Sequence, residues 1–210
     1  MPQQTAPIEL YYWPTPNGWK ISIMLEELGV PYQVRFIDIG KGDQFAPDFL
    51  KIAPNNRMPA IIDPEGPGGE PISVFESGAI LQYLGRKFDQ FYPADPRART
   101  AVDEWLFWQV GGFGPMLGQV HHFRIYAQEK IPYAIERFTT EADRLYRVLD
   151  TRLGEAEYLA GDYSIADMAC VTWAKFHEKQ GIDLAALPNV ARWLKAVLAR
   201  SAVQRGLAAI

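Results

Sequence analysis

Residues 8–28, IELYYWPTPNGWKISIMLEEL, restrict the possible folds of this chain more than any other stretch. The β-rich run 8–13 ends at Pro14, and a Pro/Asn/Gly turn follows it. Beyond the turn, apolar residues recur at the spacing of a half-buried helix face: Ile21, Met24, Leu25 and Leu28. The stretch therefore predicts a strand, a tight turn and an amphipathic helix.

Further strands and one more helix are predicted before residue 89. The run 32–37 alternates apolar residues on one side, as a strand does, and the short apolar runs 59–63 and 72–75 flank a GPGG turn that favours a hairpin. Residues 76–88 have the periodicity of a helix. The resulting order, β-α-β, a connection and then β-β-α, predicts a thioredoxin-like domain over residues 1–89, with a mixed four-stranded sheet.

The second half of the chain is predicted to be all helical. The proline-containing segment 89–96, DQFYPADP, is expected to link two domains, the second spanning 97–210. Ser164 and Asp167 form a capping-box-like helix start, and Pro188 is expected to open the last helix. The predicted fold class is α/β plus all-α, with an α/β N-terminal domain and an all-helical C-terminal domain.

Composition excludes several classes of function. The net charge is −4 and no basic cluster is present, so no nucleic-acid partner is expected. Cys170 is the only cysteine, which excludes an internal disulfide and a cysteine-based metal site and fits a reducing compartment, so a cytoplasmic location is expected. The first ten residues, MPQQTAPIEL, contain no basic region followed by an apolar run, so a secretory signal is not expected there. The uncharged stretch 105–123 contains too much glycine, glutamine and histidine for a membrane span and predicts a bent, buried helix.

The turn after the first strand is the first candidate site. It holds Thr15, Pro16, Asn17 and Gly18 at the place where a thiol–disulfide protein carries its reactive cysteines. A helix N-terminus lowers the pKa of a thiol, but no general base adjoins Thr15 that would make it a nucleophile. Thr15 and Asn17 are therefore expected to hold and activate a sulfur that arrives with a ligand. The alternative is a turn with N-cap duties alone.

Met58 and Pro59 form a second candidate, because the thioredoxin-like frame favours a cis peptide bond between them. In that frame the backbone N–H and C=O of Met58 turn outward and can pair with an extended peptide, as an added strand would. The alternative is an ordinary trans proline at the start of a strand, which base rates alone would favour.

Glu76 and Ser77 form a third candidate, at a junction between a strand and a helix. Exposed N–H groups and the helix dipole favour an anion at such a place. Ser77 could bind a carboxylate, and Glu76 could accept a hydrogen bond from an ammonium group. The alternative is an acidic cap that stabilises only its own helix.

Several segments together resemble the cytosolic glutathione transferases. They are PTPNG, NNRMPAI, FESGAILQYL, the proline-containing linker and the all-helical second half. Three further segments are more specific and resemble the bacterial nu class and its relative, the folded domain of the yeast nitrogen-regulatory prion protein: IGKGDQF at 39–45, FWQVGGFGPMLGQVHHF at 107–123 and IPYAIERF at 131–138.

The resemblance implies a homodimer that binds reduced or oxidised glutathione as co-substrate and needs no metal. It implies that Thr15 and Asn17 face the glutathione sulfur, that Gln44 contacts the glycyl end, that Met58 before Pro59 pairs with the cysteinyl unit, and that Glu76 and Ser77 hold the γ-glutamyl group. It further implies that Arg137 pairs with a carboxylate of a second glutathione, and that Glu104, taken to lie at the start of a helix, reaches across the dimer.

The activity implied by the resemblance is glutathione-dependent disulfide-bond oxidoreduction. A bound glutathione thiolate would attack a small disulfide, and a second glutathione would resolve the mixed disulfide. Reduction of a peroxide or conjugation to an electrophile would use the same thiolate and stays open at this point. A non-catalytic binding or regulatory module of the same fold is the remaining alternative.

Overall fold

The computed structural model describes residues 4–209, whose contacts divide into two compact units. The first unit comprises residues 4–94 together with 200–209, and the second comprises Asp95–Ala199. The division near residue 94 lies inside the segment expected to be a linker. The C-terminal residues were expected in the helical domain, whereas their contacts group them with the first unit.

The first unit is built on a mixed four-stranded sheet, as predicted, and the strands lie in the order β2-β1-β3-β4. β1 pairs in parallel with β2, whereas β3 pairs antiparallel with both β1 and β4. The strands are β1 (Ile8–Tyr12), β2 (Tyr32–Phe36), β3 (Ala60–Asp63) and β4 (Ile72–Phe75). The helices are α1 (Pro16–Leu28), α2 (Pro47–Ile52), α3 (Ser77–Phe88) and α10 (Ser201–Leu207), with 3-10 turns η1 (Asp43–Phe45) and η2 (Pro67–Gly69).

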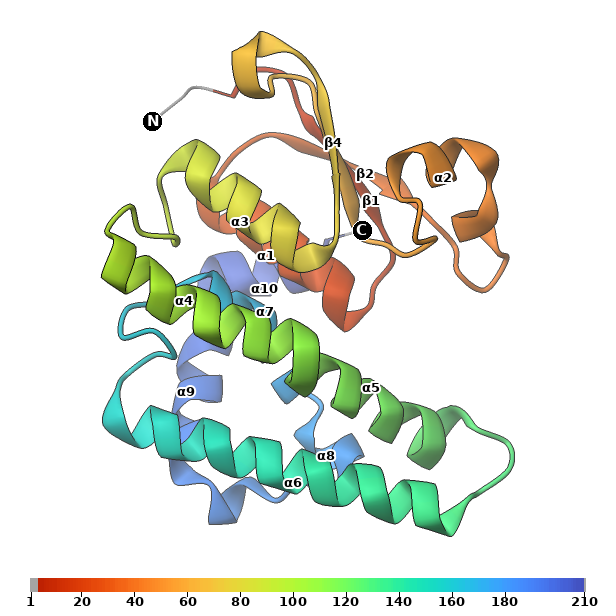
Figure 1. The fold of residues 1–210 in the computed structure, drawn as a ribbon, viewed down its shortest axis with the longest axis vertical. Coiled ribbons are helices and arrows are strands. Elements are labelled where there is room, and N and C mark those ends of the chain that lie inside the picture. Colours follow the sequence, from red (N-terminus) through yellow and green to blue (C-terminus); the bar gives the residue numbers. More distant parts are fainter. Residues whose placement is uncertain (1–3, 210) are drawn as a thin grey trace. The chain divides into compact units, whose positions relative to one another are not determined.

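The alternation along β1 decides how the sheet is covered. Ile8, Leu10 and Tyr12 are fully buried on one face, and α1 and α3 lie together on one side of the sheet (Figure 1). Tyr11 contacts the ring of Phe49 in α2, with 5.9 Å between ring centroids. A small apolar cluster around Phe49 includes the partly buried Met58, so this packing positions the chain just before β3.

Helix α10 was not expected, and the prediction that the helix opened by Pro188 is the last one was wrong. α10 packs on α1, and a Cβ on Gly206 would lie 2.6 Å from the backbone of Ile23. Ser22 Oγ donates a hydrogen bond to the carbonyl oxygen of Gly206 at 2.6 Å. The close approach of the two helices therefore depends on glycine at position 206.

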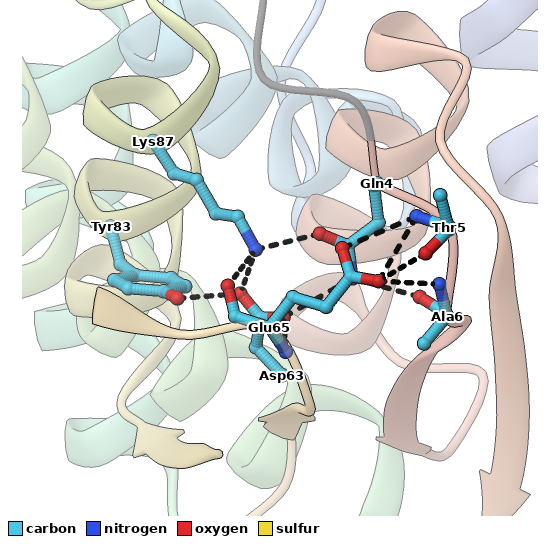
Figure 2. Close-up of polar contacts among 7 residues, drawn as sticks. All are labelled: Gln4, Thr5, Ala6, Asp63, Glu65, Tyr83 and Lys87. Carbon is cyan, nitrogen blue, oxygen red and sulfur yellow. Dashed lines mark hydrogen bonds and ion pairs between the residues drawn. The ribbon is translucent and has the colours of Figure 1, made fainter. Parts of the chain in front are cut away.

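A buried polar network joins residues 4–6 to β3 and α3 (Figure 2). The Lys87 ammonium forms an ion pair with Asp63 at 2.5 Å and also donates to Gln4 Oε1 and to the carbonyl oxygen of Glu65, at 2.6 and 2.8 Å. The Glu65 carboxylate in turn accepts hydrogen bonds from the N–H groups of Thr5 and Ala6. These contacts fix the segment that leads into β1.

The second unit is helical. Its helices are α4 (Pro96–Trp108), α5 (Gly114–His121), α6 (Pro132–Glu155), α7 (Ile165–Ala174), α8 (His177–Gln180) and α9 (Pro188–Leu198), with a 3-10 turn η5 (Leu184–Ala186). Two π-helical segments, η3 (Gln109–Phe113) and η4 (His122–Tyr126), flank α5. No helix within residues 4–209 combines the length and apolar character needed to cross a membrane.

Two local predictions for the second unit are confirmed. Ser164 and Asp167 form the capping box of α7, and Asp167 Oδ1 also accepts a hydrogen bond from Trp193 Nε1 at 2.8 Å. Cys170 is buried inside the same helix and forms no disulfide, as expected for a small apolar core residue.

Candidate functional site

The start of α1 is organised by Thr15 and Gly18. Thr15 is the N-cap in extended conformation, and its Oγ1 accepts a hydrogen bond from Gly18 N at 3.3 Å. A Cβ on Gly18 would lie 2.3 Å from the carbonyl oxygen of Trp13, so the turn requires glycine there. Thr15 therefore has the capping role of the alternative interpretation. That role uses only an oxygen lone pair, and the hydroxyl hydrogen can be donated to the carbonyl oxygen of Trp13 at 3.4 Å, a long hydrogen bond that a stronger acceptor could replace.

The first turn of α1 also provides a positive electrostatic environment. Pro16 and Asn17 are its first two residues, and no acidic side chain lies in that turn to offset the helix dipole. Asn17 is half-buried. Such a terminus stabilises a thiolate more than a thiol, so a ligand sulfur placed here would have a lowered pKa.

Met58 lies against this turn. The Met58–Pro59 peptide bond is cis, as the thioredoxin-like frame predicted. Thr15 Oγ1 lies 3.6 Å from Met58 Sδ, so the threonine hydroxyl faces a sulfur atom even within the protein itself. A thioether is a weak acceptor, and a thiolate in the same region would be a much stronger one. The structure thus brings together two of the three predicted segments.

Glu76 does not act as the acidic cap considered above. It is the N-cap residue of α3, but its side chain accepts no hydrogen bond from the helix. It is exposed, and Oε1 accepts a hydrogen bond from Asn55 Nδ2 at 3.4 Å. Its backbone has φ 70° and ψ 117°, a conformation that costs a non-glycine residue about 1–3 kcal/mol and tends to occur at binding sites.

Ser77 is the first residue of α3 and is buried. The first N–H groups of a helix have no intrahelical acceptor, and Glu76 leaves those of α3 without a side-chain cap. The terminus can therefore bind an anionic group with the Ser77 hydroxyl beside it, as the junction predicted.

Gln44 lies in η1, and its Oε1 is a buried oxygen without a hydrogen-bond partner among the residues that the structure describes. A buried acceptor left unpaired costs about 1–3 kcal/mol. An amide N–H of a bound peptide could satisfy it, so the residue fits the role that the resemblance implies.

Two predicted residues belong to the second unit. Arg137 is exposed on α6 and lines a cavity of about 650 Å³ together with Met116, Tyr133, Glu136, Phe138, Thr140 and Glu141. Glu104 is exposed in the C-terminal half of α4, so its expected place at the start of a helix was wrong. The helix begins earlier, because Asp95 caps it and Pro96 occupies its first position.

Sequence reasoning missed Lys20 and Asn55. Lys20 is only 2% exposed, and its Nζ donates a hydrogen bond to Ser77 Oγ at 3.2 Å. The spacing of Lys20 could have indicated its burial. Lys20 lies three and four residues before Ile23 and Met24, so it shares a helix face with two fully buried residues of α1. Asn55, which contacts Glu76, had no such signal. No group of three or more His, Cys, Asp or Glu suited to a metal ion occurs in the described part of the chain.

Comparison with known proteins finds family models and relatives that match this chain. The family model for the N-terminal domain of glutathione S-transferase matches residues 6–86, and that for the C-terminal domain matches residues 115–201. A curated relative, the disulfide-bond oxidoreductase YfcG of Escherichia coli (strain K12), is 52% identical over 202 residues, which cover 95% of this chain and 94% of that protein.

Two solved structures show what similar chains bind. A glutathione transferase from Burkholderia graminis, with two glutathione molecules bound per subunit, is 43% identical with a TM-score of 0.92, covering 97% of this chain and 88% of that one. A glutathione transferase from Pseudomonas putida, with one glutathione disulfide bound per subunit, is 42% identical with a TM-score of 0.92, covering 96% and 90%.

Proposed function

This chain belongs to the glutathione S-transferase family, and we propose that it reduces disulfide bonds with glutathione as the electron donor. The observation that carries the proposal is the start of α1, where the Thr15 hydroxyl lies 3.6 Å from the sulfur of Met58 in a turn that contains no protein thiol. The relative named a disulfide-bond oxidoreductase and the relative solved with glutathione disulfide support it.

The first unit would hold one glutathione by contacting each of the three residues of the tripeptide. Glu76 would accept from the γ-glutamyl ammonium, while Ser77 and the first N–H groups of α3 would bind the neighbouring carboxylate. The backbone of Met58, before Pro59, would pair with the cysteinyl unit, and Gln44 Oε1 would accept from the glycyl N–H. Two of these assignments use groups without a partner within the described residues: the start of α3, which has no side-chain cap, and Gln44 Oε1.

The sulfur would then lie at Thr15 and Asn17. The hydroxyl of Thr15, the amide of Asn17 and the helix terminus all favour the thiolate, which is the reactive form. The thiolate attacks one sulfur of a substrate disulfide, forms a mixed disulfide with glutathione and releases the other half as a thiolate that takes up a proton. A second glutathione thiolate attacks the glutathionyl sulfur, which yields oxidised glutathione and the second substrate thiol. The sum is two glutathione plus one disulfide giving oxidised glutathione and two thiols.

Arg137 would hold the second glutathione. Its guanidinium is exposed at the cavity of about 650 Å³ and can bind a carboxylate through two parallel hydrogen bonds. The relative with two glutathione molecules per subunit supports such a second site. We further propose that the chain forms a homodimer in the reducing cytoplasm. Glu104 would then reach the γ-glutamyl ammonium of the glutathione that the partner subunit binds.

The test is turnover of a small hydroxyalkyl disulfide with glutathione, followed through the oxidised glutathione formed. Wild type should turn over, and Asn17→Ala should lose at least about tenfold in kcat/KM, because a hydrogen bond to the thiolate is removed. Asn189→Ala is a matched control, since Asn189 is likewise the second residue of a helix that begins with proline. A wild-type protein without disulfide turnover would refute the oxidoreductase proposal.

The same thiolate could serve two other reactions, and a parallel assay separates them. A peroxide and an aromatic electrophile are offered with glutathione under identical conditions. Under the proposal the disulfide has the highest kcat/KM of the three. Glutathione binding without turnover of any of them would instead favour a binding or regulatory module.

A further inference from the structure

We propose that Lys20 is a positioning residue for glutathione recognition, because it orients the Ser77 hydroxyl toward the γ-glutamyl carboxylate. The inference rests on the proposed function, which places that carboxylate at the start of α3. It adds a residue from α1 that would not touch the ligand and would act on it through Ser77.

The contact is built from two neighbouring helices. α1 and α3 pack together (Figure 1). Lys20 of α1 reaches Ser77, the first residue of α3. Its side chain is 2% exposed, and Nζ lies 3.2 Å from Ser77 Oγ in a buried hydrogen bond. A lysine is almost never buried this completely unless its ammonium group is paired or hydrogen-bonded.

The chemistry of the two groups fixes the direction of the bond. A lysine ammonium has three donors and no acceptor, so the Ser77 oxygen must be the acceptor. The serine hydrogen is consequently free to be donated elsewhere. Without Lys20 the hydroxyl could rotate and offer a lone pair to the site, which would repel a carboxylate. With Lys20 in place the hydroxyl is preset as a donor.

A structural role alone would predict something different. If Lys20 only filled the space between α1 and α3, a methionine of similar length would replace it with little effect on ligand affinity. If it orients Ser77, the same replacement weakens glutathione binding while the fold persists. The two roles are therefore separable by measuring affinity and stability on the same variants.

The experiment measures the Kd for reduced glutathione by calorimetry for wild type, Lys20→Met, Ser77→Ala and the double variant. Lys20→Met and Ser77→Ala should each raise Kd by about tenfold to a hundredfold, the range for a hydrogen bond to a charged group. In the double variant the Lys20 change should add less than about twofold to the effect of Ser77→Ala, because a positioning residue has nothing left to position.

A kinetic readout checks that the effect is on binding. Lys20→Met should raise the KM for glutathione in step with Kd and leave kcat at saturating glutathione nearly unchanged, since ground state and transition state lose the same contact. Lys87→Met is the matched control, a buried lysine of the same unit whose contacts are Gln4, Asp63 and Glu65. It should lose stability but retain the wild-type Kd.

The outcomes separate the two proposals. An unchanged Kd in Lys20→Met, or an undiminished Lys20 effect in the Ser77→Ala background, refutes the role of Lys20. A wild-type protein that binds glutathione without reducing disulfides refutes the proposed activity, yet the Kd series still decides on Lys20. A wild type that does not bind glutathione refutes both. Should Lys20→Met fail to fold, Lys20→Gln is used, whose shorter side chain should weaken glutathione binding in the same range.

Discussion

Replacing Lys87 with methionine should destabilise the first unit strongly, because it leaves a buried carboxylate without its cation. The Asp63 side chain is fully buried and that of Lys87 is 15% exposed. As Figure 2 shows, the Lys87 ammonium lies between Asp63, Gln4 and Glu65, so no water replaces it easily. Methionine keeps the apolar stem of the side chain and removes only the charge and its hydrogen bonds.

The size of the destabilisation depends on the hydrogen-bond donors that Asp63 keeps in the variant. Removing one partner of a buried ion pair typically costs about 3–5 kcal/mol. The Asp63 carboxylate would keep three donors: Tyr83 OH at 2.5 Å, Glu65 N at 3.0 Å and Gln4 Nε2 at 3.2 Å. These neutral donors limit the penalty, so we expect the lower end, about 3 kcal/mol of unfolding free energy at pH 7.

The loss of unfolding free energy caused by Lys87→Met should be smaller at acidic pH than at pH 7. Burial raises the pKa of Asp63, but hydrogen bonds from Lys87, Tyr83 and the Glu65 N–H outweigh it and hold the pKa below its ordinary value. In wild type this stabilisation is present above the unfolded pKa of about 3.9 and is lost as pH falls through the folded pKa. In the variant burial dominates, the folded pKa rises, and protonation relieves the charge as pH falls. The difference in unfolding free energy between the two proteins therefore narrows as pH falls below the raised pKa of Asp63 in the variant, and it continues to narrow down to the lowered pKa of wild type.

Urea unfolding at pH 7 and at pH 4 measures both effects. The double variant Lys87→Met with Asp63→Asn is the control, since it removes both charges and should recover part of the loss. A loss below about 1 kcal/mol at pH 7 would refute the reasoning, because it would mean that the pair is not effectively buried. A loss equal at both pH values would refute the assignment to Asp63.

Three further outcomes are expected. Gly206→Ala should cost about 2 kcal/mol in urea unfolding, because its Cβ would meet the backbone of Ile23; no loss would contradict the close packing of α10. Burial raises the pKa of Asp167 to about 6, so wild-type stability should fall relative to Asp167→Asn as pH rises from about 4 to 6; parallel pH profiles would contradict this. Cysteinylglycine, which lacks the γ-glutamyl group, should show about 100-fold lower kcat/KM than glutathione; equal values would refute the roles of Glu76 and Ser77.

The strands and most helices could be predicted because their signals are local. The turn at Thr15 and the junction at Glu76 adjoin changes of periodicity, and Pro59 directly precedes β3. Each of these predicted site segments therefore lies at the boundary of a helix or strand. α10 was not predictable in the same way. It has seven residues and includes Gly206. The glycine is needed because α10 closely approaches the backbone of Ile23 in α1, far earlier in the chain.

Lys20 could not be predicted from the sequence pattern, and Gln44 was expected only through the family resemblance. A lysine within a helix usually indicates a solvated face, and only the packing of α3 on α1 buries this one. The unpartnered oxygen of Gln44 depends on how a short 3-10 turn lies against its surroundings, which no local pattern encodes. In both cases the chemistry arises from a tertiary contact rather than from residue type or spacing.

The hydroxyl groups of Thr15 and Ser77 have a similar hydrogen-bond arrangement. A hydroxyl has one hydrogen to donate and two lone pairs, so its role toward a ligand depends on which of these the protein uses. Gly18 N–H donates to Thr15 Oγ1, and the Lys20 ammonium donates to Ser77 Oγ. In each pair a fixed donor occupies a lone pair, so the hydroxyl hydrogen is directed elsewhere. Under the proposed function the Ser77 hydrogen is donated to a carboxylate, and the Thr15 hydrogen, which the carbonyl oxygen of Trp13 and the sulfur of Met58 can accept in the free protein, is donated to a thiolate. Because both donors belong to α1, the orientation of the two hydroxyls is set by one helix before any ligand arrives.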